Sequence, residues 1–505
     1  MAHTVAGLRL GIARARLGSA AAIIDPQRGV GACEENRLTR ARQAPTSGPP
    51  TLATAELLAY FGRNNGEITA TGVVRDPDSA TWFSRPAIEV DAHLAHAEYA
   101  FRASSFDDAL VVVCDASVPQ GWSAWRYRER GTSSAIPVDT DAGHFPIARI
   151  YGELTEALGF QAARDEHVIE AMARAGEGRE NAVTDAIRIG DDGIEIVPNV
   201  RAVIADVAAL DDSQRGQIAS SAQRRLGECL VELLTRLAHA TGAKNICLSG
   251  GLFFNTQFTT AALRAGAFEH SYIPPHPGRS GSALGAALLV GDSHPAAAAL
   301  ASPYLGPGYT DTEVKAALEN CKLAFDLQRT DQVLATVVRA LSRGHLVGWF
   351  HGRLEWGPRA LGHRTVLADP FSAHVLDNLN GYLKKRPAYR TYGVSVPRTR
   401  VAEFFAGAEE SPYMQYEYQP RDPEKFRSIL PAGVKTLRVH TVDERTPRYL
   451  RLLEQWGEVS GAPVLVNTSF NGFHEPLVCS PRDAIRVFYG TGLDLLALED
   501  FVLRK

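Results

Sequence analysis

Short apolar runs alternate with glycine-rich turns and amphipathic segments along the first three hundred residues. The runs at 8–12, 20–24 and 109–114 have the length and composition of buried strands. The segment 216–242 has apolar residues at helical spacing and ends at a glycine, which predicts a long amphipathic helix. This alternation of strand, glycine turn and helix is typical of an α/β domain.

The pattern is interrupted at 292–307, which is rich in alanine and proline and has little hydrophobic periodicity. Helix and strand patterns resume after it. We therefore expect an N-terminal domain at 1–298 and a C-terminal domain at 299–505. Each is long enough to bury a hydrophobic core of its own.

Composition narrows the classes of function. The 505 residues include 53 Lys and Arg against 57 Asp and Glu, a net charge of −4, so the basic excess typical of nucleic-acid binding is missing. None of the six cysteines forms a C-x-x-C pair, which argues against a zinc ribbon and is typical of a reducing compartment. Neither a signal-peptide pattern nor an apolar run of 18 residues occurs. We expect a cytoplasmic protein without nucleic-acid or membrane partners.

Charged side chains that could bind an anionic ligand are most concentrated at 352–370. This segment reads G-R-L-E-W-G-P-R-A-L-G-H-R-T-V-L-A-D-P. This segment holds three arginines and one glutamate within twelve residues, and a second basic cluster follows it. The two groups are Arg353, Glu355, Arg359 and Arg364, then Lys384, Lys385, Arg386 and Arg390. Guanidinium groups match phosphate or carboxylate oxygens, and glycines let the backbone approach a ligand closely. The pattern predicts a pocket for an anion, most simply a phosphate; the alternative is a turn whose arginines point into water.

Two features of the N-terminal half are candidates for function. The segment 249–255, S-G-G-L-F-F-N, places a glycine pair between a strand and a helix, where free backbone N–H groups can bind a phosphate. Paired glycines are also common in α/β turns that bind nothing. Asp115 ends the predicted strand 109–114, a frequent position for functional acids. It fits an ordinary helix or turn cap equally well.

Several of these segments match one known family. The chain resembles the O-carbamoyltransferases of the NodU/CmcH type. Its residues 352–364 are close to the family motif G-R-x-E-x-G-P-R-A-L-G-x-R, and 467–484 match the C-terminal signature, with His474 in place of a glycine. E-E-N-R-L-T-R at 34–40 and S-G-G-L-F-F-N match the N-terminal half. The resemblance implies a duplicated actin-like ATPase (ribonuclease-H-like) domain followed by a YrdC-like α/β domain with a twisted sheet.

By this resemblance the C-terminal domain binds ATP, with Mg²⁺, and carbamoyl phosphate, and forms a carbamoyl-adenylate. The K-x-R and S-x-N tetrad of YrdC-like domains corresponds to Lys384, Arg386, Ser469 and Asn471. Such groups are needed because the two substrates bring several negative charges into one pocket. The resemblance implies further binding or catalytic roles in this half for Arg353, Glu355, Arg359, Arg364, Arg390, Arg438, Asn467 and Thr468.

The resemblance also implies that the N-terminal domain transfers the carbamoyl group at a mononuclear iron site. The family's ligands are an H-x-x-x-H pair, an aspartate after a strand and an aspartate in a late glycine turn. These positions are occupied here by Ala92, His96, Asp115 and Arg279. Two of four ligands are retained, so bound Fe²⁺ would need His93 or another histidine as a further ligand. Alternatively, Arg279 could stabilise the carbonyl oxygen in place of the metal.

The role of His96 stays open between a general base and a core histidine satisfied by hydrogen bonds. In the same half, Gly250, Gly251 and Asn255 are expected to line a nucleotide-shaped cleft. In the other half, the family segment with a histidine and an aspartate is shortened to 432–440, A-G-V-K-T-L-R-V-H, which retains Arg438.

Three functional hypotheses follow. The first is an ATP-dependent carbamoyltransferase that acts on a hydroxyl or amine of a small natural product such as an antibiotic precursor, with a homodimer as an open expectation. The second is an enzyme that activates a different small acid as an adenylate, motivated by the shortened segment 432–440. The third is a nucleotide-binding partner protein without catalysis, motivated by the altered metal ligands.

Overall fold

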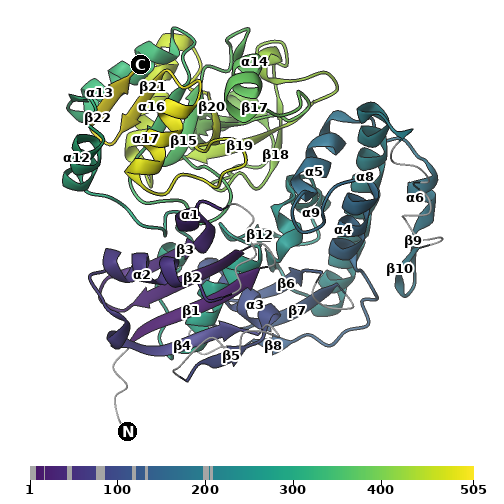
Figure 1. Cartoon of the computed structure of the whole chain (residues 1–505). Coiled ribbons are helices and arrows are strands. Elements are labelled where there is room, and N and C mark those ends of the chain that lie inside the picture. Colours follow the sequence, from purple (N-terminus) through teal and green to yellow (C-terminus); the bar gives the residue numbers. More distant parts are fainter. Residues whose placement is uncertain are drawn as a thin grey trace. The chain divides into compact units, whose positions relative to one another are not determined.

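The structure is a computed structural model of the chain (Figure 1), and it describes residues 7–15, 18–41, 48–75, 86–116, 121–130, 135–196, 204 and 209–505. The chain forms two compact units. Unit 1 comprises Met1–Glu35 and Gln43–Ser302, and unit 2 comprises Asn36–Arg42 and Pro303–Lys505. The sequence places a single change of domain at 298/299, and it does not anticipate that a short N-terminal segment belongs to unit 2.

Unit 1 contains two five-stranded sheets with the same topology. The first has the order β3-β2-β1-β4-β5 and is formed by β1 (Leu8–Ala15), β2 (Gly18–Asp25), β3 (Gly29–Glu34), β4 (Ile68–Val74) and β5 (Ile88–Val90). The second has the order β8-β7-β6-β11-β12 and is formed by β6 (Ala109–Cys114), β7 (Trp122–Tyr127), β8 (Ile136–Pro137), β11 (Asn245–Ser249) and β12 (His270–Tyr272). In each sheet the first three strands in the chain pair antiparallel, and the last two extend the sheet in parallel. This repeat confirms the predicted duplicated α/β fold.

The helices of unit 1 lie around these sheets (Figure 1). They are α2 (Thr51–Tyr60), α3 (Ala92–Ala103), α4 (Ile147–Ala157), α5 (Glu166–Ala175), α6 (Ala182–Ala186), α8 (Asp212–Thr241), α9 (Thr256–Ala265), α10 (Ser282–Leu289) and α11 (Ala297–Leu300). A separate hairpin is formed by β9 (Ile187–Gly190) and β10 (Gly193–Ile196). The long predicted helix is α8. It begins at a capping box of Asp211 and Gln214, and it ends because Gly242 takes the left-handed conformation with φ 61°.

The helix α10 has the sequence S-A-L-G-A-A-L-L, and its small residues allow close packing on both sides. A Cβ atom at Gly285 would lie 1.8 Å from the carbonyl oxygen of Ala95 in α3. On the other side, a Cβ atom at Gly11 of β1 would lie 1.9 Å from the carbonyl oxygen of Ala283. Glycine is therefore required at both contacts, which fix α3 and its histidines against the first sheet.

Unit 2 is built on one mixed ten-stranded sheet with the order β13-β22-β21-β14-β15-β20-β16-β19-β18-β17. Its strands are β13 (Asp326–Leu327), β14 (Val347–Phe350), β15 (Arg364–Ala368), β16 (Gly393–Pro397), β17 (Phe405–Ala406), β18 (Glu417–Pro420), β19 (Leu437–Val442), β20 (Leu465–Ser469), β21 (Leu495–Leu498) and β22 (Phe501–Arg504). The pairs β14–β21 and β16–β19 are parallel, and the remaining neighbours are antiparallel.

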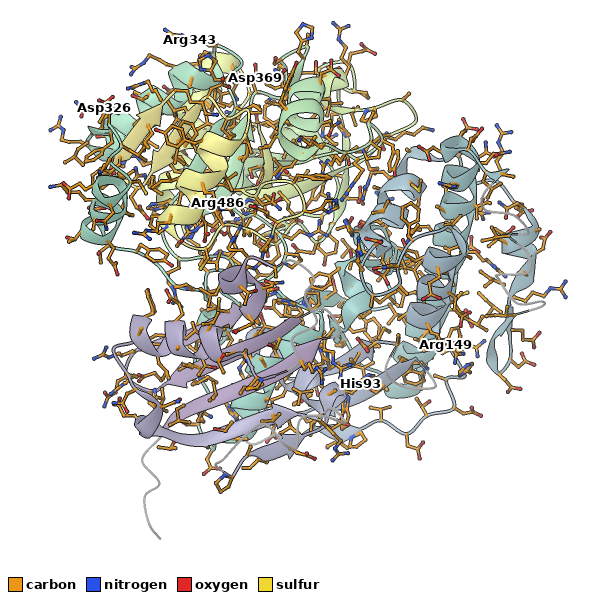
Figure 2. All side chains as sticks on the ribbon, in the orientation of Figure 1. His93, Arg149, Asp326, Arg343, Asp369 and Arg486 are labelled. Atoms are coloured by element: carbon orange, nitrogen blue, oxygen red, sulfur yellow. The ribbon has the colours of Figure 1, made fainter. Side chains whose placement is uncertain are left out.

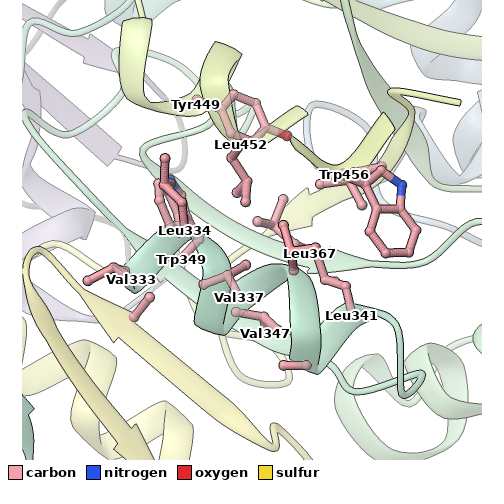
Figure 3. Packing of buried hydrophobic residues seen from close by; sticks show 14 of the residues in the cluster. Val333, Leu334, Val337, Leu341, Val347, Trp349, Leu367, Tyr449, Leu452 and Trp456 are labelled. Carbon is pink, nitrogen blue, oxygen red and sulfur yellow. The ribbon is translucent and has the colours of Figure 1, made fainter. Parts of the chain in front are cut away.

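The helices of unit 2 are α12 (Asp311–Asn320), α13 (Thr330–Leu341), α14 (Val375–Asp377), α15 (Val401–Phe404), α16 (Pro447–Ser460), α17 (Pro481–Gly490) and the π-helix η6 (Asn378–Lys384), while α1 (Glu35–Thr39) begins at the change of unit. The main core of unit 2 lies between α13, α16 and the sheet (Figure 3). It is formed by apolar side chains that include Val337, Leu341, Val347, Trp349, Leu367, Leu452 and Trp456. In the part of the chain that the structure describes, no helix combines the length and apolarity needed to cross a membrane.

Candidate functional site

Three of the four predicted tetrad residues meet at one point of unit 2. The Nζ atom of Lys384 donates hydrogen bonds to the backbone oxygen of Ser469 and to Asn471 Oδ1, both at 2.5 Å, and to Ser469 Oγ at 3.3 Å. Ser469 Oγ in turn donates to Asn471 Oδ1 at 2.9 Å. The ammonium group of Lys384 thus lies beside carbonyl, amide and hydroxyl oxygen atoms of the S-x-N segment.

Local backbone geometry places Lys384 there. The π-helix η6 ends at Lys384, and Lys385 then takes the left-handed conformation with φ 45°, which reverses the chain. The partners come from another segment, because Ser469 is the last residue of β20 and Asn471 lies two residues after it. Single-turn π-helices and left-handed residues other than glycine are concentrated at functional sites.

The fourth tetrad residue, Arg386, has separate partners. Its Nε donates to Asn380 Oδ1 at 3.3 Å, its Nη2 donates to the backbone oxygen of Thr391 at 3.2 Å, and its guanidinium lies 4.0 Å from the ring centroid of Tyr392. Burial lowers the pKa of this guanidinium. Arg386 therefore holds its own loop closed, and the structure does not bring it into hydrogen-bond contact with Lys384.

The segment 352–364, which carries the three arginines of the predicted anion pocket, forms a loop, called here the arginine loop. This loop is organised around Glu355, which is 1% exposed. Its Oε1 accepts hydrogen bonds from the backbone N–H groups of Leu361, His363 and Arg364 at 2.9, 3.0 and 2.9 Å. Asn467 holds the same loop from β20, since its Nδ2 donates to the backbone oxygen of Ala360 at 3.0 Å. These hydrogen bonds of Glu355 and Asn467 therefore support the loop, and the predicted contact of both residues with a nucleotide stays a prediction.

Two of the loop arginines point inward. Arg364 is fully buried, its Nη1 donates to the backbone oxygen of His351 at 2.9 Å, and its guanidinium lies 3.5 Å from the ring centroid of Phe350. Burial lowers its pKa. Arg353 donates to the backbone oxygens of Gly306 and Leu305 at 2.9 and 2.6 Å. Arg364 has no exposed surface in the structure, and its predicted contact with a phosphate stays a prediction.

The remaining predicted residues of unit 2 differ in how far they are buried. Thr468 is 8% exposed on β20, next to Ser469. Half-buried positions, which leave part of the side chain accessible, are occupied by Arg359, Arg390 and Arg438. Their contact with phosphates stays a prediction.

In unit 1 the glycine pair lies against the end of β6. A Cβ atom at Gly250, whose φ is 104°, would lie 2.1 Å from the carbonyl oxygen of Cys114, so only glycine fits. A Cβ atom at Gly251 would lie 3.6 Å from Asp115 Oδ2. The predicted turn and the predicted acid are thus neighbours at the ends of the parallel strands β11 and β6.

Asn255 begins α9. Its Oδ1 accepts hydrogen bonds from the backbone N–H groups of Gln257 and Phe258, and its Nδ2 donates to Tyr151 Oη at 3.1 Å and to Gln223 Oε1 at 2.9 Å. All of these partners lie inside unit 1. The contacts identify Asn255 as a helix cap, and its predicted role in a nucleotide cleft stays a prediction.

Both halves of this architecture match known family models. Residues 54–288 match the model described as the carbamoyltransferase N-terminus, and residues 338–505 match the carbamoyltransferase C-terminus. The chain belongs to the carbamoyltransferase family. The match identifies this protein as an enzyme, a carbamoyltransferase, and confirms the family expected from the sequence motifs.

Relatives of this carbamoyltransferase include bacterial proteins of similar or greater length. The uncharacterized protein sll1178 of Synechocystis sp. is 30% identical over 476 residues, which cover 83% of this chain and 76% of that protein. The nodulation protein NolO of Bradyrhizobium diazoefficiens is 33% identical, and the match covers 58% of this chain and 55% of NolO. This chain thus spans about half the length of NolO.

Solved structures are more distant from this carbamoyltransferase. The activator of the 2-hydroxyisocaproyl-CoA dehydratase from Clostridium difficile with bound ADPNP covers 56% of this chain and 94% of its own, with 13% identity and a TM-score of 0.38. Full-length HypF in the phosphate- and nucleotide-bound form covers 56% of this chain and 46% of its own, with 13% identity and a TM-score of 0.37. At these scores the similarity is too low to indicate a function.

In the described part of the chain, the two histidines predicted as possible iron ligands are hydrogen-bonded to serine hydroxyl groups. His93 Nδ1 and Ser123 Oγ share a hydrogen bond of 2.6 Å, whereas His96 Nδ1 and Ser249 Oγ share one of 3.2 Å (His93 is labelled in Figure 2). Among the residues that the structure describes, no group of three or more His, Cys, Asp or Glu side chains is placed to hold a metal ion. The positive charge of Arg279 also contributes to lowering the pKa of both histidines, after the larger effect of burial. These residues do not fit the Fe²⁺ that the resemblance implies.

Because His96 is buried, the free energy of unfolding of unit 1 is expected to fall at acidic pH. Burial lowers the pKa of His96 to about 4, so the folded chain keeps it neutral, whereas the unfolded chain binds its proton near pH 6.5. The unfolded state therefore binds more protons between these values, and the free energy of unfolding of unit 1 is expected to fall by about 3 kcal/mol as the pH drops from 6.5 to 4. Denaturant unfolding across this range measures the slope. His96→Gln should reduce it, and the same change at the exposed His239 should leave it unaltered.

The sequence did not predict that Arg40 binds the loop that follows Asn471. Arg40 donates to the backbone oxygens of Pro476 and Leu477 at 2.8 and 2.6 Å, and it lies 3.4 Å from Asp483. Asn471 Nδ2 donates to the backbone oxygen of Glu475 at 2.7 Å within the same loop. The motif E-E-N-R-L-T-R contained Arg40, but its spacing gave no indication that it belongs with residues more than four hundred positions away.

Proposed function

We propose that unit 2 makes a carbamoyl-adenylate from carbamoyl phosphate and ATP, and that unit 1 passes the carbamoyl group to a hydroxyl or amine of a small natural product. The observation that carries this proposal is the convergence of Lys384, Ser469 and Asn471. The expected cytoplasmic location and a homodimeric state are part of the same proposal.

The proposed reaction balances in three steps. Water releases phosphate from carbamoyl phosphate and leaves carbamate. A carbamate oxygen attacks the α-phosphorus of ATP, and the bond to pyrophosphate breaks, which yields carbamoyl-adenylate. The acceptor oxygen or nitrogen then attacks the carbamoyl carbon, loses its proton and displaces AMP. The adenylation step places further negative charge on the phosphoryl oxygens, which a fixed ammonium group stabilises.

The roles follow from the contacts of each side chain. Lys384 supplies the positive charge, while Ser469 and Asn471 hold its Nζ in place and offer neutral hydrogen-bonding groups to a phosphate or ribose. Arg359, Arg390 and Arg438 are proposed as further phosphate partners because they are only half-buried. Mg²⁺ would enter with ATP and offset the charge of its phosphates.

In unit 1 the proposed acceptor site lies around Asp115, the Gly250–Gly251 turn and His96. The low pKa of His96, caused mainly by burial, keeps its imidazole neutral at physiological pH, the form that a general base requires. Arg279 is proposed to stabilise the carbonyl oxygen as charge develops on it. No step is assigned to a metal.

The test is formation of AMP and pyrophosphate by the purified chain, with and without carbamoyl phosphate. Product that requires carbamoyl phosphate supports the proposal. In a parallel ATP–pyrophosphate exchange assay, other small acids are offered in its place, because the segment 432–440 lacks the family's histidine and aspartate. Exchange with another acid and inert carbamoyl phosphate would replace the proposal by a different adenylate-forming activity.

A further inference from the structure

The loop that carries Asn471 is closed and held at several points. Its base is joined by the hydrogen bond from the N–H group of Val478 to the backbone oxygen of Phe470 at 2.9 Å. The N–H group of Phe470 donates to the backbone oxygen of Arg364 at 3.0 Å, and Glu475 N–H donates to Gly472 at 3.3 Å. Together with the Asn471–Glu475 bond, these contacts close the loop on itself.

Ion pairs hold the far side of the same loop. Arg486 on α17, labelled in Figure 2, donates to both carboxylate oxygens of Glu475, with the Nη2–Oε2 bond at 2.9 Å. Arg40 lies 3.6 Å from Glu475 and binds the two following backbone oxygens. The pKa of Glu475 is lowered, mainly by its hydrogen bond to Arg486, which keeps the carboxylate charged. Ion pairs and hydrogen bonds therefore hold the loop on the side opposite its base.

Two aromatic rings project from this tip. Phe473 is 49% exposed, and the ring centroids of Phe473 and His474 lie 4.0 Å apart. His474 has a φ of 56°, a left-handed conformation that disfavours side chains other than glycine. A strained residue is thus maintained beside an exposed phenylalanine on a clamped loop, which is a pattern found at ligand sites.

We propose that the exposed ring of Phe473, supported by the ring of His474, is the surface on which the adenine base of ATP stacks. The inference rests on the proposed function, because it takes the phosphates to lie at Lys384 and Asn471. Phe473 is two residues beyond Asn471, so their Cα atoms are at most about 7 Å apart. A ribose spans a gap of this size, which leaves the base over the rings. Aromatic side chains bind bases by stacking because every base offers a π-face.

Binding of ATP and of inorganic tripolyphosphate to the full-length protein, measured by calorimetry, tests this inference. Phe473→Ala is expected to weaken ATP binding roughly 5- to 100-fold and to leave tripolyphosphate binding unchanged, because only the base is lost from the contact. Phe473→Trp should retain ATP binding. Tyr489→Ala removes a comparably exposed ring, 46% exposed, at the end of α17 and should alter neither affinity.

A second variant, His474→Gly, tests the same inference. Glycine accepts the left-handed conformation without strain, so the melting temperature of unit 2 should rise by about 2–4 °C while ATP binding weakens. Unchanged ATP affinity in both Phe473→Ala and His474→Gly would overturn the inference. So would an equal loss of ATP and tripolyphosphate binding in Phe473→Ala, which would mean that the ring only supports the loop. If the unaltered protein binds neither ATP nor tripolyphosphate, the result contradicts the proposed function itself and not only the stacking surface.

Discussion

Replacing Lys384 by alanine is expected to lower carbamoyl-phosphate-dependent AMP formation at least about 100-fold. The Nζ atom is the charged centre of the Ser469–Asn471 cluster, and removal of one group that stabilises transition-state charge typically costs two to three orders of magnitude in rate. Initial rates at saturating ATP and carbamoyl phosphate measure the effect. The loss should appear mainly in kcat, since the developing charge on the phosphoryl group is stabilised most in the transition state.

A matched control separates this effect from the loss of any lysine. Lys315 lies on the surface of α12, where it is paired with Glu319 at 3.5 Å, and Lys315→Ala should change the rate less than about twofold. Ser469→Ala should have an intermediate effect, because Lys384 keeps its bonds to Asn471 Oδ1 and the backbone oxygen of residue 469. Turnover that is equal in Lys384→Ala and the unaltered enzyme would reject the assignment of the site.

The convergence of Lys384, Ser469 and Asn471 could be predicted because short motifs define it. Each motif has a fixed local geometry: S-x-N begins at the last residue of a strand, and Lys384 ends a helical segment before a reversal of the chain. The family resemblance assigns the two motifs to one tetrad, so the sequence alone predicts that Lys384 lies beside Ser469 and Asn471. The duplicated sheets of unit 1 were expected from the family resemblance, whereas the strand pattern alone predicted only an α/β domain.

The arginine loop shows why other residues could not be placed. Three arginines within twelve residues indicate an anion site, but the sequence does not tell which way each side chain points. In the structure Arg353 binds backbone carbonyl oxygens and Arg364 is buried against Phe350. Guanidinium groups bind carbonyl oxygens as readily as phosphates, so only the tertiary packing distinguishes the two uses.

The segment 36–41 belongs to unit 2, whereas the expected boundary at 298/299 assigns it to the N-terminal domain. Local hydrophobic periodicity assigns it to the domain in which it occurs in the chain, whereas Arg37 donates to the backbone oxygen of Gly357 at 2.8 Å and Arg40 binds the loop of unit 2. Such long-range contacts leave no periodic signal.

Replacing Glu355 by alanine is expected to lower the free energy of unfolding of unit 2 by about 3–5 kcal/mol. The change leaves the buried N–H groups of Leu361, His363 and Arg364 without their acceptor, and each buried unsatisfied donor costs about 1–3 kcal/mol. It also removes the negative charge that contributes most to offsetting the buried guanidinium of Arg364. Calorimetry of the full chain should show the transition of unit 2 lowered by roughly 10 °C.

Glu355→Gln separates the two contributions. The amide oxygen of glutamine can still accept the three N–H groups, so only the charge is lost, and the cost should be about half that of the alanine variant. If the loop is held by its hydrogen bonds, alanine must be clearly worse than glutamine. Equal destabilisation by both variants would mean that the charge alone holds Arg364 in the core. A cost below about 1 kcal/mol in both would show that Asn467 and the surrounding packing support the loop without Glu355.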